Sequence, residues 1–305
     1  MELLRALEAI RHPFLDQVVA AVTMLGDETF FMAAGMFIFW CINKKWGFRF
    51  MIIGLSGSVV NQLLKAIFLI PRPWVLDPEF TIVESAREGA SGYSFPSGHT
   101  QTAANVFGTL ALWLRRRWVT AVCVAFILLI GFSRMYLGVH TPLDVGVSLI
   151  VGAVTVLGFG WLFQKMENCR KGKIGIGLGA LALAVIFLLY VYLAPVTERN
   201  IAEFDAHAVE NAWKLLGTTA GMLLAWWVDD RRTHFEVKAV WWAQILKLVL
   251  GLVLVVAAQK GLKPVFAALF GGAAFPHAIR YFCMAVVGGV LWPMTFGFWS
   301  QFGRK

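Results

Sequence analysis

Charged residues are scarce in this sequence: 15% of its 305 residues are Asp, Glu, Lys or Arg, whereas 59% are hydrophobic. Soluble domains usually carry about 25% charged residues. Several apolar runs also reach the roughly 17–25 residues that a helix needs to cross a bilayer. The shortage of charge therefore argues against an ordinary soluble domain and predicts an integral membrane protein, with the lipid bilayer as a partner.

Cysteine is scarce as well, and the four that occur lack the spacing of a metal-binding motif. Cys41, Cys123, Cys169 and Cys283 stand far apart, in or beside apolar segments. Cysteine in such places usually serves as a small buried hydrophobe, so we expect no metal site there. Residues 1–25 also lack the basic start, apolar centre and small-residue cleavage site of a signal peptide.

The apolar runs predict an all-α fold, a polytopic bundle of membrane helices, because only helices supply this many crossings from one chain. We expect about nine crossings after an amphipathic helix that lies in the membrane interface at residues 1–26. The crossings are expected at residues 29–42, 50–70, 99–114, 118–132, 143–163, 174–195, 213–228, 239–258 and 282–299.

Basic residues are in excess, with a formal net charge of +9, yet they gather in short loops between the apolar runs. One alternate set of loops holds most of them: Lys44, Lys45, Arg49, Arg115, Arg116, Arg117, Lys165, Arg170, Lys171, Lys173, Arg231, Arg232, Lys238, Arg304 and Lys305. Basic loops remain in the cytoplasm. We therefore expect this set and the C-terminus on the cytoplasmic side of a plasma or inner membrane, and no nucleic-acid partner.

A basic stretch at Lys165–Lys173 divides the chain. Every polar motif described below lies before it and on the extracytoplasmic side. Four further expected crossings follow it without a recognisable catalytic pattern. We expect residues 1–165 to form the catalytic membrane core and residues 166–305 to add membrane helices whose role the sequence does not define.

Two cations stand at the outer end of the second expected crossing. Lys65 is followed seven residues later by Arg72, which lies between Pro71 and Pro73 where the helix must end. Such a pair suits a phosphate, with the lysine as a point charge and the arginine as a bidentate fork. The alternative is a snorkelling lysine beside an interfacial arginine.

The run Pro96-Ser97-Gly98-His99 begins the third expected crossing. Ser97 has the residue type of a helix N-cap, and Gly98 lets backbone amides approach a ligand closely. Helix N-termini bind anions through free amides and the helix dipole, and His99 is placed there to act as a general acid. The alternative is a capped helix start that binds nothing.

The third run contains Ser133-Arg134, then His140 and Asp144. Arg134 would add another cation for a phosphate. His140 and Asp144 stand at positions i and i+4, so they share one face if a helix begins there. A carboxylate that holds one imidazole N–H leaves the other nitrogen free to attack, although a purely structural pair is the alternative.

Together, the three runs resemble the signature of the type 2 phosphatidic acid phosphatase family, K-x6-RP, PSGH and SR-x5-H-x3-D, at every position. The resemblance covers about residues 26–165 and implies a metal-independent phosphatase, without a cofactor, that works through a phosphohistidine. It implies that His140 is the nucleophile, that Asp144 orients it and that His99 protonates the leaving oxygen. The residues implied to hold the phosphoryl oxygens are Lys65, Arg72, Ser97, Gly98 and Arg134.

Two acidic residues follow the amphipathic segment. Asp27 and Glu28 stand at the outer end of the first expected crossing, where they could support the site, contact a headgroup or simply cap a helix. The loop at residues 74–95 is expected to cover the site.

Three other polar residues stand in the second half. Lys247 lies inside the eighth expected crossing, and we expect it to pair with Asp229 or Asp230 or to line a polar path. His277 and Arg280 are expected at the membrane interface.

The motifs predict a substrate that carries a phosphate or diphosphate on a lipid whose tail stays in the bilayer. Because the motifs face outward, a polyprenyl diphosphate such as undecaprenyl diphosphate comes first, followed by phosphatidylglycerol phosphate and phosphatidic acid. An alternative of another class is a lipid transporter or scramblase that uses the motifs to bind phosphate. The sequence leaves the oligomeric state open.

Overall fold

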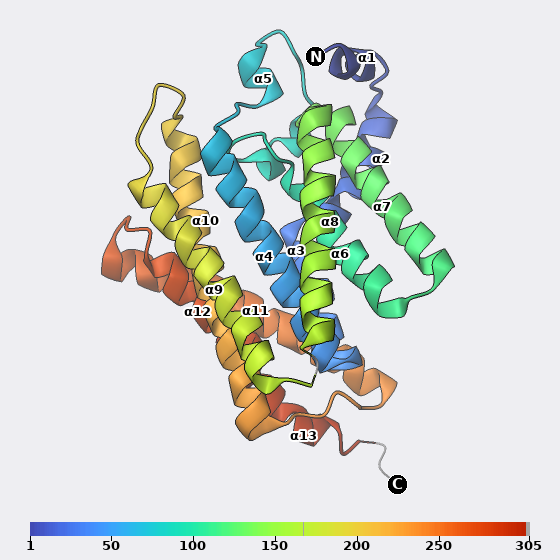
Figure 1. Ribbon diagram of the computed structural model, residues 1–305, viewed down its shortest axis with the longest axis vertical. Helices are drawn as coiled ribbons and strands as arrows, with labels where there is room; N and C mark the ends of the chain where they lie inside the picture. Colours follow the sequence, from blue (N-terminus) through green and yellow to red (C-terminus); the bar gives the residue numbers. More distant parts are fainter. Residues whose placement is uncertain (167, 303–305) are drawn as a thin grey trace.

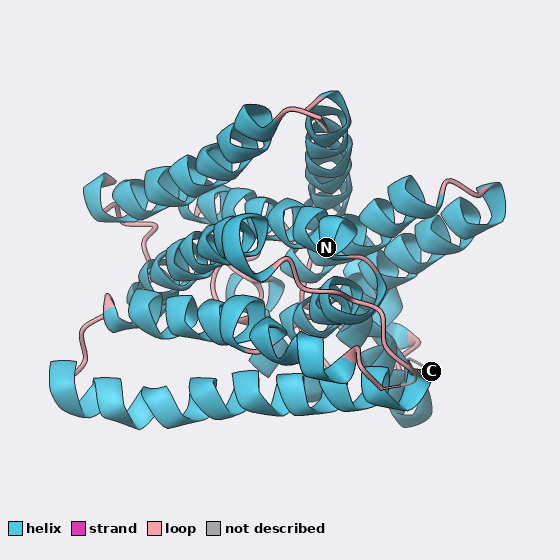
Figure 2. Ribbon diagram, turned by 90° about the horizontal axis from the view of Figure 1, so that it is seen from below, coloured by secondary structure: helices cyan, strands magenta, loops and turns pink. Residues whose placement is uncertain are grey.

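The computed structural model describes residues 1–166 and 168–302. Within them every regular element is helical, and the long helices stand side by side in one bundle (Figures 1 and 2). The predicted all-α bundle is therefore confirmed.

The first half contains α1 Glu2–Ala9, α2 Pro13–Thr23, α3 Glu28–Phe37, α4 Lys44–Phe68, α5 Pro73–Leu76, α6 Gly98–Leu114, α7 Arg117–Tyr136 and α8 Pro142–Lys165. The second half contains α9 Arg170–Leu193, α10 Ala202–Val228, α11 Trp241–Phe270, α12 Pro276–Val286 and α13 Phe296–Trp299. Single π-helical turns at Ile38–Ile42 and Val287–Leu291 prolong α3 and α12.

Helix α4 is the centre of the bundle and contacts α3, α6, α8, α9 and α10. Its apolar residues are buried along most of its length, which removes them from both water and lipid. Small residues let the neighbouring helices approach closely: a Cβ added to Gly152 of α8 would lie 2.5 Å from the Cβ of Ala104 on α6. The tight packing fixes the ends of α4, α6 and α8 relative to one another.

Six helices of the described chain are long and apolar enough to cross a membrane, or seven if the bent pair of residues 13–26 and 28–42 counts as one. The expected count of about nine is not confirmed. Helix α6 has 17 residues, and polar residues interrupt the first half of α10. The chain is nonetheless an integral membrane protein by the length and composition of its helices.

The N-terminal segment differs from the single interfacial helix that its sequence predicts. It forms two helices, α1 and α2. The first helix ends at Ala9, and a second begins at Pro13, a residue suited to the first position of a helix. Helix α2 packs against α7, and α1 lies at the upper end of the bundle (Figure 1). The N-terminus thus adds a layer beside the signature runs.

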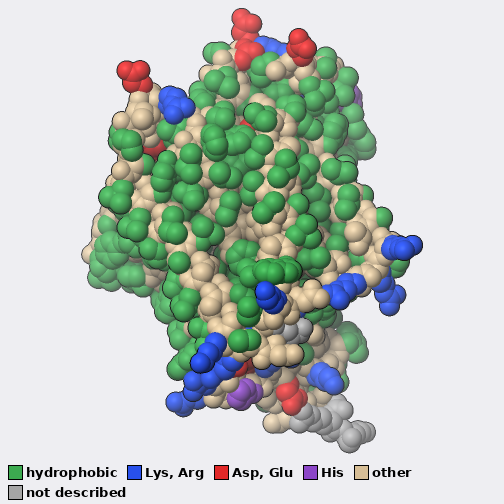
Figure 3. Space-filling model, in the orientation of Figure 1, with side chains coloured by type: hydrophobic (Ala, Val, Ile, Leu, Met, Phe, Trp, Pro, Cys, Tyr) green, Lys and Arg blue, Asp and Glu red, His purple; other side chains and the backbone are tan. Residues whose placement is uncertain are grey.

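Most of the basic side chains visible in Figure 3 lie at one end of the molecule, and most of the acidic ones lie at the other. On the face in Figure 3, hydrophobic side chains cover the middle, basic ones gather at the lower end and acidic ones stand at the upper end. The upper end is the one at which α4 finishes and α6 and α8 begin (Figure 1). The signature runs therefore lie at the end opposite the basic loops.

The expected pairing of Lys247 is wrong. Its ammonium lies 4.1 Å from the centre of the Phe296 ring, and the two aspartates pair with cations of the surrounding loops. These pairs are Asp229 with Lys44 at 2.8 Å and Asp230 with Arg170 at 2.9 Å.

His277 and Arg280, which the sequence places at the membrane interface, contact each other, and His277 also contacts a carboxylate of α10. Arg280 is buried, and its Nη2 lies 2.9 Å from Nδ1 of His277. The same ring nitrogen lies 3.4 Å from a carboxylate oxygen of Glu210 on α10. Close packing of α12 on α10 draws these side chains inward.

Candidate active site

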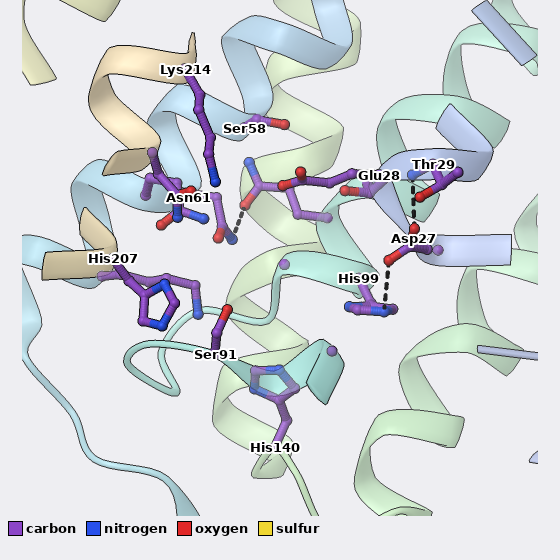
Figure 4. Close-up of a pocket in the computed structure, with 18 of the residues that line it drawn as sticks. Asp27, Glu28, Thr29, Ser58, Asn61, Ser91, His99, His140, His207 and Lys214 are labelled. Atoms are coloured by element: carbon purple, nitrogen blue, oxygen red, sulfur yellow. Dashed lines mark hydrogen bonds and ion pairs between the residues drawn. The ribbon is translucent and has the colours of Figure 1, made fainter. Parts of the chain in front are cut away.

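The three signature runs meet around a polar cavity of about 440 Å³ near the upper end of the bundle (Figure 4). Lys65, Arg72, Gly98, His99 and His140 line it, as their shared chemistry predicts. Part of the 74–95 loop also lines the cavity, through residues 88, 89 and 91. Segments that are distant in sequence thus form one site.

His140 stands between α7 and α8 with its two ring nitrogens in different surroundings. Its Nδ1 lies 3.5 Å from Oδ2 of Asp144, and its Nε2 lies 2.9 Å from Nη1 of Arg72. A guanidinium can only donate hydrogen bonds, so Nε2 must accept. The ring proton is therefore assigned to Nδ1, on the side of Asp144, and the lone pair of Nε2 is directed at Arg72, which lines the cavity.

Asp144 is held rigidly behind that histidine. It belongs to a capping box at the start of α8, in which the Thr141 amide donates to Oδ2 at 2.7 Å. The Ser94 hydroxyl donates to the same oxygen, also at 2.7 Å. Because the carboxylate is buried and bonded from two sides, it can fix the orientation of the imidazole.

The two cations of the first run are oriented by backbone carbonyls. Arg72 donates to the carbonyls of Gly92 at 2.9 Å, Ser91 at 2.8 Å and Val139 at 3.0 Å. Lys65 donates to those of Tyr93 at 2.5 Å and Ser94 at 3.4 Å. In the described part of the chain no carboxylate forms an ion pair with either cation. Carbonyls orient these charges without neutralising them, which leaves them available for an anion.

His99 lies across the cavity from His140 (Figure 4). Its Nε2 is 3.8 Å from Oδ2 of Asp27, whose other oxygen accepts from the Thr29 amide at 2.8 Å and caps α3. Asp27 is therefore both a helix cap and a neighbour of His99. Glu28 lines the cavity separately.

Ser97 and Arg134 lie behind the wall of the cavity rather than on it. The Ser97 hydroxyl is buried and accepts from the amide and hydroxyl of Thr100 at 3.4 and 2.9 Å, which makes it the N-cap of α6. Arg134 is 1% exposed and donates to the Thr23 hydroxyl at 3.1 Å. Its Nε and Nη2 have no partner among the described residues, so its charge reaches the cavity only through space.

The site keeps His140 neutral. Burial, followed by the charges of Arg72 and Lys65, holds the pKa of the His140 imidazole well below its usual value of 6.5. A neutral imidazole with a free lone pair is the form that can act as a nucleophile. The same cations that would bind a phosphate thus also keep the ring in its reactive form.

Much of the remaining lining was missed from the sequence. Three helices each present four residues at spacings i, i+3, i+4 and i+7, which place them on one face. These are Ser58, Asn61, Gln62 and Lys65 of α4; Gly98, Gln101, Thr102 and Asn105 of α6; and His207, Glu210, Asn211 and Lys214 of α10. This repeat of polar residues at helical spacing was the signal in the sequence that could have identified them as residues of the site. The seventh crossing was expected only from residue 213, which left most of the α10 set in an assumed loop.

A membrane bundle with a histidine and two cations around one polar cavity has an arrangement that suits the chemistry of a phosphate group. Comparison with known families agrees: residues 46–168 match the PAP2 superfamily. Residues 213–301 match the transmembrane extension of PAP2 superfamily phosphatases. The chain belongs to the PAP2 superfamily.

Several curated proteins are similar to it. Undecaprenyl-diphosphatase BcrC of Bacillus subtilis is 34% identical over 120 residues, which are 39% of this chain and 57% of that protein. Phosphatidylglycerophosphatase B of Bacillus subtilis is 30% identical over 55% of this chain and 84% of its own length. The crystal structure of Aquifex aeolicus LpxE matches with a TM-score of 0.46 and 28% identity, over 52% of this chain and 92% of that one.

Proposed function

We propose that this protein removes the terminal phosphate from a lipid phosphate or diphosphate through a phosphohistidine, at the extracytoplasmic face and without a metal ion. The observation that carries the proposal is the setting of His140. Its Nε2 faces the cavity at 2.9 Å from Arg72, and its Nδ1 faces Asp144. We assign the chemistry to the core at residues 1–165.

In the first step, Nε2 of His140 attacks the phosphorus atom while Arg72 turns from the ring to a phosphoryl oxygen. A P–N bond forms and the bond from phosphorus to the lipid oxygen breaks. Lys65 and Arg72 stabilise the charge on the phosphoryl oxygens, together with the amide of Gly98 and the nearby charge of Arg134. His99 gives its proton to the leaving oxygen.

In the second step, a water molecule attacks the phosphorus and His99 takes a proton from it. The P–N bond breaks, inorganic phosphate leaves and His140 returns to its neutral form. Asp144 keeps the Nδ1 proton in place throughout. Ser97 supports this geometry as the helix cap that presents Gly98 and His99.

Metal independence is supported by the way in which charge is supplied. Lys65, Arg72 and Arg134 place fixed positive charge where a metal ion would otherwise neutralise the phosphate. Within residues 1–166 and 168–302, no three His, Cys, Asp or Glu side chains are grouped so that they could hold a metal.

The extracytoplasmic position is supported by the basic loops at the opposite end of the bundle, which the positive-inside rule assigns to the cytoplasm.

For the substrate we place a polyprenyl diphosphate such as undecaprenyl diphosphate first, because such a lipid meets an outward-facing site. Phosphatidylglycerol phosphate is a second candidate, favoured by the uncharged polar lining beyond His99. Phosphatidic acid is a third.

The proposal is tested by phosphate release in detergent with EDTA, with the three lipids supplied side by side. We expect release that resists EDTA and falls at least about a thousandfold in His140→Ala. His234→Asn, an exposed histidine on the lower loops, is the matched control and keeps full activity. Release that EDTA abolishes would contradict metal independence. No release from any lipid by the folded wild type would favour a transporter instead.

A further inference from the structure

Helix α10 forms the wall of the cavity that the signature does not supply. His207 and Lys214 both line the cavity, and the step of seven residues from one to the other corresponds to a rise of about 10 Å along the helix. In Figure 4, Lys214 and Ser58 lie on the side of the cavity away from His140. The cavity is therefore longer than one phosphate needs, and its far part is polar.

The α10 wall has no surplus of positive charge. Lys214 pairs with Glu210 at 2.8 Å, and Glu210 also lies 3.4 Å from His277. Glu28 faces the same space from the opposite side. This part of the cavity differs in sign from the clamp formed by Lys65 and Arg72, and it does not suit a second phosphate.

Unfilled hydrogen-bond acceptors line the cavity on α4 and α6. Asn61 and Asn105 are each 3% exposed, and the side-chain oxygen of each has no partner among the described residues. Glu28 also lines the cavity, but this residue is exposed and does not belong to these buried acceptors. Buried acceptors without a partner are rare because each costs free energy. The two asparagine oxygens call for a ligand that donates.

Hydroxyl groups fit this arrangement better than the other polar groups of lipids. A hydroxyl can donate to Asn61, Asn105 or Glu28 and accept from Lys214 at the same time. A phosphate would bring negative charge to Glu28 and unfilled acceptors. A positively charged ammonium group would be repelled by Lys214.

We propose that the α10 wall, together with Asn61, Asn105 and Glu28, binds hydroxyl groups of the substrate headgroup. This inference rests on the proposed phosphatase function and narrows its substrate class to lipids with hydroxyls close to the phosphate that is removed. Asn61 stands one helical turn from Lys65, and Asn105 two turns from Gly98. One and two helical turns correspond to distances of about 5–10 Å along the helices, which is about the length of a polyol headgroup. A phosphorylated polyol lipid thus moves ahead of a polyprenyl diphosphate, which carries no hydroxyl.

Two lipids that differ by one hydroxyl test the inference directly. Phosphatidylglycerol phosphate carries a hydroxyl beside its terminal phosphate, and the propane-1,3-diol analogue lacks it. We expect wild-type kcat/KM to favour the hydroxylated lipid by at least about tenfold, because the analogue leaves buried acceptors unpaired. In Lys214→Met this preference falls to below about threefold, and Lys214→Arg restores part of it.

Lys260→Met is the matched control, because this exposed lysine of α11 keeps the wild-type preference. If Lys214→Met fails to fold, Asn211→Ala serves instead, since the Asn211 side chain lines the cavity and makes no hydrogen bond within the described residues. The inference is overturned if wild-type kcat/KM is nearly the same for the two lipids, or if Lys214→Met and Asn211→Ala both leave the wild-type preference unchanged. In either case, phosphate release would still support the phosphatase. No release from either lipid by the folded wild type overturns the proposed function itself.

Discussion

The two ends of the cavity are built in different ways. At the His140 end, Asp144 and Arg72 are buried and bonded from several directions, and each comes from a contiguous motif. At the α10 end, the side chains of Glu210 and Lys214 are only half-buried and come from one face of a helix in the second half of the chain. Groups that must react are fixed, whereas groups that meet a variable headgroup keep some freedom.

This contrast separates the effects expected from substitutions. Changes at the His140 end remove interactions that matter in the transition state, so they lower kcat. Changes at the α10 end alter the discrimination between substrates. The predictions below test whether the two ends can be separated in this way.

The largest effect is expected for Asp144→Asn. The amide keeps the shape of the side chain but no longer holds the His140 proton on Nδ1, so kcat should fall by about 10²–10⁴. Steady-state kinetics on any accepted substrate measures this. Asp230→Asn, which changes an aspartate at the lower end that pairs with Arg170, should leave kcat unchanged. A similar loss in both variants would mean that the effect is a general one on folding.

A loss of similar size, but one that depends on the substrate, is expected for His99→Gln. Loss of the general acid should slow the release of an alkoxide by about 10²–10⁴. A nitrophenolate needs little protonation, so p-nitrophenyl phosphate should lose less than about tenfold. The ratio of the two losses is the measurement. Equal losses on both substrates would contradict a proton transfer by His99.

The pH dependence of wild-type activity follows from His140. Its pKa is held below 6.5 by burial and by Arg72 and Lys65, so the ring stays neutral as the pH falls through 6.5. On the acidic side, activity is lost at lower pH, when the ring takes up a proton. We expect kcat/KM to begin its acidic decline below pH 6.5. The decline should occur at the same pH for alkyl and nitrophenyl phosphates, whose own ionisations differ. A decline that starts above pH 6.5 would contradict this setting of His140.

The smallest effect is expected for a substitution of Tyr93, a residue of the 74–95 loop that contacts both Lys65 and the start of α10. The Tyr93 hydroxyl donates to Asp205 at 3.0 Å and accepts from the Ile201 amide at 2.9 Å, while the Tyr93 carbonyl accepts from Lys65. Tyr93→Phe should cost about 1 kcal/mol of unfolding free energy and lower kcat/KM a few-fold. Thermal unfolding and kinetics measure the two changes.

Tyr192→Phe is the control for that variant, because it removes a tyrosine hydrogen bond between α9 and α10 away from the site loop. We expect the same loss of stability with unchanged kinetics. The same kcat/KM in the two variants would mean that the contact of Tyr93 with α10 does not help to position the loop carbonyl that accepts from Lys65.

The signature end could be predicted from the sequence because its groups are contiguous. Proline, glycine and the spacing of His140 and Asp144 fix local geometry, and the expected convergence was correct for these residues. The setting of Ser97 and Arg134 behind the wall could not be predicted, since it depends on how α6 and α7 pack. The first half of α10 was missed because its polar residues resemble those of a loop, and the packing of this helix against α4, α9 and α12 could not be read from the sequence.

Identification of the covalent intermediate tests the central claim most directly. Substrate labelled with ³²P in the terminal phosphate is mixed with the enzyme, quenched in alkali within milliseconds and digested for peptide analysis. We predict an acid-labile, alkali-stable label on the peptide that contains His140, absent from His140→Ala and present in His234→Asn. An active enzyme that carries no such label, or carries it on another residue, would contradict the mechanism.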